Sequence, residues 1–479
     1  MTTNNEATRP SAAQWLMLAN VCLGQFVGAV DARSVNVALP TLSVYFGTSM
    51  EVVQWIPLAY QLTVVGLVLS LGRLGDAVGR KKIYNSGFVI FMAGSALCGL
   101  ATGVLPMIFF RVLEGIGGAM ILANGRAIAS AVFGSANRGK ALGITSMAFH
   151  MGYIVGPSFG GFLIDTLGWR WIFFVNLPFA LAGAVMAWKV LPESVKKNGA
   201  YSIDPLGMAT LLLSVVFLVL GLHQATRSGL ELRTAGMLLL SALSLALFIF
   251  FERRTAVPLI DLDLFRMRAF SAALISQALI SLSQTATFLL IPFYLQGILS
   301  FSPTQVGLTI IFYSVVVVFM APIGGSLSDR LGSRVLCTAG CFCTFISILS
   351  LVRLQSTSAH WEVMLPLAGM GLGWSLFASP NLSALFGSVT SERLGAVSGA
   401  TVTAANTANA VGIALASLLF SRWLDYYGVP AASATTYEGW LKNPVPYLSA
   451  FQNSWAIVAA FALVAVAMSA VRGKRATKP

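Results

Sequence analysis

The stretch Leu71-Gly72-Arg73-Leu74-Gly75-Asp76-Ala77-Val78-Gly79-Arg80-Lys81-Lys82 lies between two long apolar runs and is interrupted by glycines. A second stretch, Gly325 to Arg334, repeats its order of glycine, leucine, aspartate, glycine and basic residue at matching offsets. Self-similarity of this kind indicates an internal duplication. We therefore expect two like halves, each with this stretch after its second helix.

The residues of the repeated stretch suit a short turn at a membrane surface. Glycine adopts the backbone angles that a tight turn requires, and basic residues hold such a turn at the cytoplasmic side. Asp76 and Asp329 stand out, because a turn at the membrane face needs no acid. A carboxylate there can accept hydrogen bonds from free amides at a helix start. For the arginines and lysines, a role in membrane topology alone is the alternative.

The composition excludes a soluble domain. Of 479 residues, 57% are hydrophobic and 10% are charged, against roughly 45–50% and about 25% in soluble proteins. The formal charge of +13 does not indicate nucleic-acid binding, because most Lys and Arg fall on alternate loops and at the termini, as the positive-inside rule expects. We predict a multi-pass protein of the inner (cytoplasmic) membrane, with both termini cytoplasmic.

Apolar runs of about 18 or more residues predict about fourteen membrane helices. They form groups of six, two and six, so we expect a six-helix bundle in residues 1–192, a linker with two inserted helices in 193–268, and a second six-helix bundle in 269–479. The expected spans are residues 14–39, 52–71, 83–102, 105–128, 139–163, 171–191, 206–224, 234–251, 270–295, 304–326, 335–353, 362–386, 395–421 and 450–471.

No enzyme motif is found in the sequence. It contains no phosphate-binding loop, dinucleotide fingerprint, metal-spaced His/Cys set or nucleophile elbow. The five cysteines all lie in apolar runs and are interpreted as packing residues. We therefore expect neither an enzyme nor a bound cofactor or metal, and no drive by ATP.

Five ionisable residues lie well inside the expected spans, all in the first half: Asp31, Arg33, Arg111, Glu114 and His150. Charge inside hydrocarbon is costly, so such residues mark functional sites. A helix rise of ~1.5 Å per residue places Asp31 and Arg111 at overlapping depths. Arg111 and Glu114, three residues apart, share a helix face. We hypothesise a charge-balanced cluster in which Asp31 pairs with Arg111 and Glu114 holds either arginine.

Such a cluster is able to bind and release a proton. Burial favours the neutral form of a carboxylate and a nearby guanidinium favours the charged form, so moving the arginine changes the proton affinity. One charge crossing 100 mV is worth about 2.3 kcal/mol, so one or two protons suffice to drive uphill export. The alternatives are a permanent salt bridge that only fixes helix packing and, for His150, a hydrogen-bonded packing residue.

The fifth span contains Gly152-Tyr153-Ile154-Val155-Gly156-Pro157-Ser158-Phe159-Gly160-Gly161. Glycines four residues apart give a smooth groove for close helix packing, and a proline inside a helix removes one amide and bends it. Packing alone explains the glycines. The more specific Gly-Pro-x-x-Gly-Gly order indicates a bend at which one bundle rocks on the other.

These motifs together resemble the major facilitator superfamily, and within it the fourteen-span drug/proton antiporters. Gly72 to Lys82 matches the loop after the second helix, Arg111 to Ala119 the fourth-helix motif, and Gly152 to Gly161 the antiporter motif. The resemblance implies that Asp31 and Arg111 carry proton coupling and that Asp76 and Arg80 help to lock the outward-facing state. The residues assigned to conformational gating are Gly72, Asp76, Gly79, Arg80, Asp329, Arg330, Gly152, Gly156, Pro157 and Gly160.

The chain departs from that family pattern at a few positions. Arg33 and Ser34 stand where the family usually has Thr and an apolar residue, Glu114 where it has Gln, and Ala123 where it has Pro. An added arginine and glutamate change either the proton stoichiometry or the charge of the substrate. The family's preference for lipophilic cations is therefore not carried over.

The sequence predicts a proton-driven exporter of small amphipathic compounds that works by alternating access between the two bundles. Its cavity is expected near the midplane, lined by Tyr60, Gln284, Trp374, Asn381 and Asn406. The expected partners are the substrate, protons, the lipid bilayer and, in a Gram-negative cell, a periplasmic adaptor, with the monomer as the working unit. The alternatives are a proton symporter or an exporter of one metabolite, siderophore or lipid, and a transport-inactive sensor.

Overall fold

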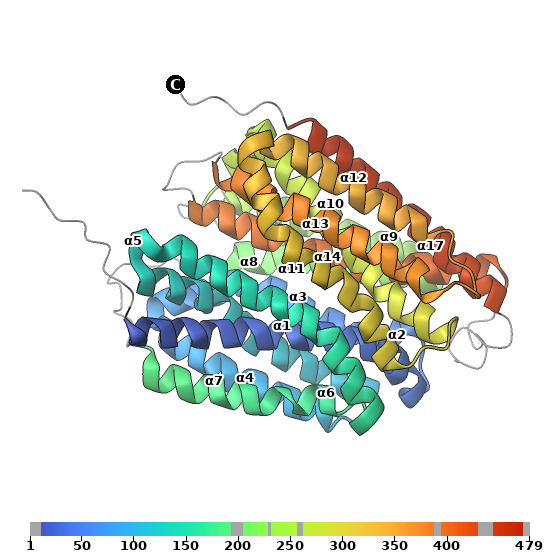
Figure 1. Cartoon of the computed structure of the whole chain (residues 1–479), viewed down its shortest axis with the longest axis horizontal. Helices are drawn as coiled ribbons and strands as arrows, with labels where there is room; N and C mark the ends of the chain where they lie inside the picture. Colours follow the sequence, from blue (N-terminus) through green and yellow to red (C-terminus); the bar gives the residue numbers. More distant parts are fainter. Residues whose placement is uncertain are drawn as a thin grey trace, which may run out of the picture.

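The computed structural model describes residues 11–192, 205–228, 231–255, 262–387, 394–429 and 444–472. Within these ranges the chain forms long helices that run side by side, and none of the described residues is in a strand (Figure 1). Thirteen of the described helical segments are long and apolar enough to cross a membrane. The predicted all-α membrane fold is therefore confirmed.

The first group of helices contains the six expected spans. Its members are α1 (Ala12–Phe46), α2 (Met50–Val53), α3 (Trp55–Val78), α4 (Arg80–Gly99), α5 (Val104–Leu167), α6 (Trp171–Phe174) and α7 (Asn176–Val190). Helix α5 holds two spans, 104–133 and 147–167. The span absent from the thirteen is α4, whose first turn is the basic run Arg80 to Lys82. It packs between α3, α5 and α7 and completes the expected fourteen.

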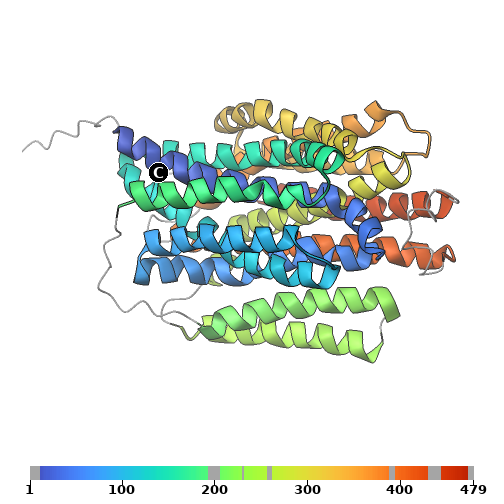
Figure 2. The same ribbon diagram turned by 90° about the horizontal axis from the view of Figure 1, so that it is seen from below.

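The second group is preceded by a helix pair that touches both groups. The helices are α8 (Pro205–Ser228), α9 (Leu232–Glu252), the short 3-10 helix η1 (Leu262–Arg266), α10 (Arg268–Gly297), α11 (Pro303–Leu331), α12 (Ser333–Leu351), α13 (His360–Gly387), α14 (Leu394–Tyr426) and α17 (Pro444–Ala470). Helices α8 and α9 pack on each other along one side of the molecule (Figure 2), and α8 also contacts α3 and α14. The division of the chain at residues 192 and 268 stays a prediction.

The expected short turn is present, but the helices on either side of it extend further than the expected spans, which ended at residue 71 and began again at residue 83. Helix α3 continues to Val78 and α4 begins at Arg80, so Gly79 alone makes the turn, at a φ of 121°. The matching Gly332 separates α11 from α12 at a φ of 82°. Positive φ is open to glycine and strained for other residues. Near a membrane, continued helix is favoured over loop because it satisfies its own backbone hydrogen bonds.

The two groups of helices are hydrogen-bonded to each other at the end of the bundle away from Ser11, where α1 starts. Gln296 Nε2 donates to the carbonyl of Val37 at 3.0 Å, and the amide of Thr304 donates to Asp165 Oδ2 at 2.8 Å. Ser421 Oγ donates to Glu51 Oε1 at 2.7 Å. We call this the closed end of the molecule.

Candidate transport site

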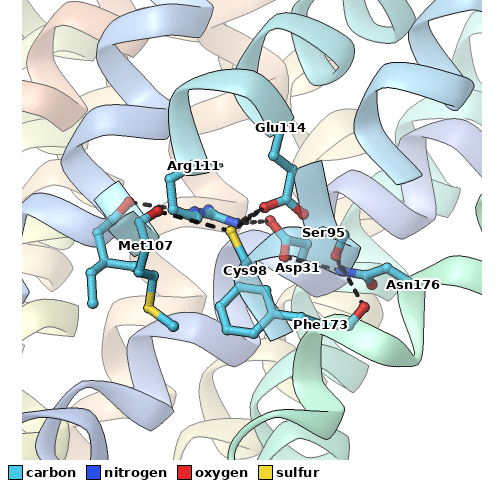
Figure 3. Close-up of polar contacts among 9 residues, drawn as sticks. Asp31, Ser95, Cys98, Met107, Arg111, Glu114, Phe173 and Asn176 are labelled. Carbon is cyan, nitrogen blue, oxygen red and sulfur yellow. Dashed lines mark hydrogen bonds and ion pairs between the residues drawn. The ribbon is translucent and has the colours of Figure 1, made fainter. Parts of the chain in front are cut away.

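Asp31, Arg111 and Glu114 form a compact charged cluster inside the first group of helices (Figure 3). Arg111 Nη1 lies 2.8 Å from Asp31 Oδ2 and 2.7 Å from Glu114 Oε2. The three side chains are at most 1% exposed. Two carboxylates therefore share one guanidinium nitrogen in a site without contact to the surface.

Neutral side chains hold the acids of this cluster in place. Asn176 Nδ2 donates to Asp31 Oδ1 at 3.1 Å and to Ser95 Oγ at 3.0 Å, while the Ser95 hydroxyl donates to the carbonyl of Phe173. Cys98 Sγ lies 3.6 Å from Glu114 Oε2 and donates to it. No pattern in the sequence pointed to Ser95, Cys98 and Asn176, because neutral polar residues inside apolar runs carry no charge signal.

Helix α4 comes close enough to place two of these side chains because of a glycine. A Cβ atom at Gly94 would lie 2.6 Å from the Cα of Glu114, so any larger residue would push α4 away from α5. Ser95 and Cys98 follow on the same helix and reach the cluster from there. Small residues at such crossings let membrane helices pack backbone to backbone.

Arg33 is not part of this cluster. Its guanidinium carbon lies 4.0 Å from the ring centroid of Tyr153 in α5 and 4.8 Å from that of Phe288 in α10. The sequence left Arg33 and Arg111 as possible partners of Glu114, and only Arg111 forms an ion pair with it in the structure.

A cavity lies between the two groups of helices and encloses about 90 Å³. Tyr60 and Asn406, both expected as lining residues, border it. Gln61 also borders the cavity and donates to Asn406 Oδ1 across the two groups at 2.9 Å. The Tyr60 ring centroid lies 4.5 Å from the guanidinium carbon of Arg111, so Tyr60 contacts the charged cluster and also borders the cavity.

Three other residues expected at the cavity lie elsewhere in this structure. Gln284 is buried and accepts a hydrogen bond from the Tyr313 hydroxyl at 2.9 Å. Asn381 is fully buried and donates to Gln277 Oε1 at 2.9 Å. Trp374 packs beside Phe377. Each contacts a residue of its own group of helices.

The glycines of the fifth span form the groove in which α1 lies. Cβ atoms at Gly152 and Gly156 would lie within 3 Å of the carbonyls of Phe26 and Val30, and one at Gly160 would meet Ser34. Ser34 Oγ donates to the carbonyl of Gly156 at 2.8 Å. This part of α5 therefore holds α1, and with it Asp31, in close register.

The other face of the same segment meets the second group of helices. Ser158 Oγ donates to the carbonyl of Gly307 in α11 at 3.2 Å, and a Cβ at Gly307 would collide with the backbone at Pro157. The Gly-Pro motif therefore lies between α1 and the opposite half.

The residues of the repeated stretch are placed only in part. Arg80 Nη1 donates to the carbonyl of Ala127 at 3.2 Å, and Gly72 lies in α3, where an added Cβ would make ordinary contact with Ala123. The side chains of Asp76, His150, Asp329 and Arg330 lie outside the described residues.

Known proteins resemble this chain over almost its whole length. It is 30% identical over 413 residues to a riboflavin transporter of Clostridioides difficile, covering 86% of this chain and 90% of that protein. It is also 30% identical over 438 residues to a multidrug resistance protein of Mycobacterium tuberculosis, covering 90% and 79% of the two chains. Among solved structures, an inward-facing bacterial homologue of the human lysosomal transporter Spinster matches with a TM-score of 0.70 at 15% identity, covering 97% and 98% of the two chains.

The family model of the Major Facilitator Superfamily matches residues 21–412. This match spans the charged cluster, the cavity and the repeated stretch, and the fold agrees with it. The protein is thus a multi-pass membrane transporter and not an enzyme, and it belongs to the major facilitator superfamily.

Proposed function

We propose that this transporter exports small amphipathic compounds in exchange for protons. The observation that carries the proposal is the buried cluster in which Asp31 and Glu114 share the single guanidinium of Arg111. Two ionised carboxylates beside one arginine leave an excess negative charge in hydrocarbon, which is costly. Binding one proton removes that charge. The resemblance to proteins named for multidrug resistance supports export of drugs as the cargo class.

The position of Tyr60 connects the proton site to the cargo site in this proposal. Its ring lies against Arg111 on one side and borders the cavity on the other. A substrate that displaces this ring opens the cluster to water from the cavity. The proton on the acid pair is then released to the side from which the substrate came. The acid pair binds another proton from the opposite side after the transporter has changed conformation and released its substrate.

The direction of export follows from the charge on the loops. We propose that the terminal end of the bundle faces the cytoplasm, because most Lys and Arg lie on that side. The halves are joined at the opposite end, so the state described is one that receives cargo from the cytoplasm. The cell membrane as location, a monomeric working unit and a periplasmic adaptor in a Gram-negative cell stay predictions.

Drug susceptibility in a pump-deleted host is the test of this function. Cells that express the protein are expected to tolerate higher concentrations of some amphipathic compounds, and Asp31→Asn, which keeps size and removes the charge, is expected to abolish the gain. Asp425→Asn is the matched control, because Asp425 is exposed at the end of α14. In liposomes, accumulation of the same compounds has to follow an imposed pH gradient. Accumulation that ignores the gradient would refute proton coupling.

Export of a single metabolite is the second candidate, and the resemblance to a riboflavin transporter favours it. The same cells and liposomes decide between the two. A multidrug exporter protects against several unrelated compounds, whereas a dedicated exporter protects against none and moves one metabolite, with riboflavin as the first to be measured.

A further inference from the structure

Arg33 lies on the face of α1 that borders the cavity. Gln25, Gly28, Ala29 and Ala32 of this helix line the cavity, and their spacing of three and four residues marks one helix face. Arg33 is the next position along that face, four residues after Ala29. Its guanidinium stacks on Tyr153, which also borders the cavity. The arginine therefore stands at the edge of the cavity toward the closed end.

Within the part of the chain that the structure describes, aromatic rings and no acid contact the guanidinium of Arg33. Tyr153 comes from the first group of helices and Phe288 from the second, and the two rings hold the guanidinium between the halves. Phe288 is itself fixed edge-on by Tyr313 at 4.8 Å between centroids. Among the described residues no carboxylate lies within ion-pair distance of Arg33, since the acids of the cluster are both paired with Arg111.

A second observation points to a ligand in the same cavity. Gln25 is 3% exposed and borders the cavity, yet neither its amide nitrogen nor its amide oxygen has a hydrogen-bond partner among the residues that the structure describes. A buried amide without partners costs free energy that a bound polar group would recover. Gln25 lies two helical turns from Arg33, so one elongated molecule is able to reach both.

We infer that the cavity binds flat aromatic anions, with the anionic group on Arg33 and a polar atom at the far end on Gln25. An arginine stacked on aromatic rings keeps its planar edge free to donate two hydrogen bonds to a carboxylate, sulfonate or phosphate. The remaining wall offers aromatic and aliphatic surface from residues such as Phe91, Ile121 and Phe149 to the ring system. This inference rests on the proposed export function and specifies its substrate class.

Binding to the purified full-length protein in detergent tests this inference without any gradient. The probes are 6-hydroxynaphthalene-2-sulfonate, its neutral isostere 6-hydroxynaphthalene-2-sulfonamide, and the cation (6-hydroxy-2-naphthylmethyl)trimethylammonium, whose hydroxyl is the polar atom meant for Gln25; binding is measured by equilibrium dialysis. The sulfonate is expected to bind about 10-fold or more tightly than the sulfonamide, because a hydrogen bond to a charged group adds that much. Arg33→Gln is expected to remove this preference and to leave sulfonamide binding within about 3-fold. Gln25→Leu is expected to weaken both equally.

Two controls keep the outcomes separate. Arg266→Gln makes the same change at an arginine that is 86% exposed and does not border the cavity, and it should alter no affinity. Arg33→Lys keeps the charge and should retain part of the preference if Arg33→Gln does not fold. Equal or absent binding of the sulfonate, preference for the cation, or loss of all three probes in Arg33→Gln would overturn the inference. Failure of proton-driven transport in liposomes, with sulfonate binding intact, would refute only the proposed coupling.

Discussion

The two groups of helices in this transporter each have a glycine break after their second span but differ in the chemistry of their interiors. The first half buries Asp31, Arg111 and Glu114. In the described parts of α10 to α14 and α17, the buried polar side chains are all Ser, Thr, Asn or Gln. Many of these bond to their own helix, as Ser276 does to the carbonyl of Ala272 and Thr287 to that of Ser283. Such groups do not respond to protons.

The difference shows how two similar groups of helices divide their tasks. Gly79 and Gly332 break the helix at the matching place in each group. Hydroxyl groups satisfied within one helix are cheap to bury, whereas each buried charge needs partners from several helices. The charged cluster draws such partners from α1, α4, α5 and α7. The first group of helices therefore holds the charges and their partners, and the second group contributes neutral polar residues such as Asn406 to the cavity wall.

The largest effect is expected from Arg111→Leu. It leaves two buried carboxylates without their common partner, and breaking a buried pair in this way costs about 3–5 kcal/mol. Thermal unfolding in detergent should show the loss, and gradient-driven transport should be absent. Arg266→Leu, at an exposed ion pair with Asp263, should cost less than about 1 kcal/mol.

A triple variant separates stability from coupling in the same experiment. Arg111→Met combined with Asp31→Asn and Glu114→Gln removes all the charges together, and we expect it to regain most of the stability, since apolar or neutral replacements of buried ion groups are often tolerated. Transport should stay absent. A stable Arg111→Leu variant would contradict the account of the cluster as a single charged unit.

The next effect is expected from Glu114→Gln, which makes the first half more like the second. The variant has one carboxylate for one guanidinium, so the excess charge that a proton neutralises is gone. Stability should change by less than about 1 kcal/mol, because the amide keeps the shape and the hydrogen bond to Arg111. The ratio of proton to substrate flux in liposomes should fall by one proton per turnover. An unchanged ratio would assign the transported proton to Asp31 alone.

Sequence patterns predicted the helices and the pairing of Asp31 with Arg111 for simple physical reasons. An apolar run of about 20 residues has one low-energy form in a membrane. The fixed rise per residue sets the depth of each buried charge, so residues at equal depth are the candidates for pairing. Depth alone does not give the direction in which a side chain points. The sequence therefore left Arg33 and Arg111 as possible partners of Glu114, and in the structure only Arg111 pairs with it.

The rest of the site depends on tertiary contacts, and the sequence does not indicate which of many possible contacts are made. Arg33 stacks between Tyr153 and Phe288, but with 31 Phe and 11 Tyr in the chain no pattern singles out these two rings. Asn176 supports Asp31 from a helix that begins 145 residues later along the chain. Gln284 and Asn381 were expected at the cavity, but they hydrogen-bond to Tyr313 and Gln277 instead. The sequence does not predict these partners.

A smaller effect is expected at the contact between the halves. Gly307→Ala adds a methyl group against the backbone at Pro157, and such overpacking costs about 1–3 kcal/mol. The added methyl group is strained only while Gly307 lies against Pro157. The variant should therefore favour the state in which the two groups of helices separate at this end. Spin labels at positions 167 and 300, in a background with the five cysteines replaced, should show a longer distance distribution than the parent. An unchanged distribution would show that this crossing does not hold the end closed.

The smallest effect on transport is expected at the matched glycine breaks of the two groups of helices. Gly79→Ala and Gly332→Ala each force a side chain into positive φ, at a cost of about 1–3 kcal/mol. The two losses in thermal stability should be of similar size, since both turns need a positive φ, 121° at Gly79 and 82° at Gly332. Gly236→Ala is the control, because it lies in α9 with open space around it and should cost nothing. If the turns serve structure alone, transport per folded molecule should be equal in both variants. A selective loss of transport in Gly79→Ala would instead show that the half that carries the charged cluster also uses its turn to change state.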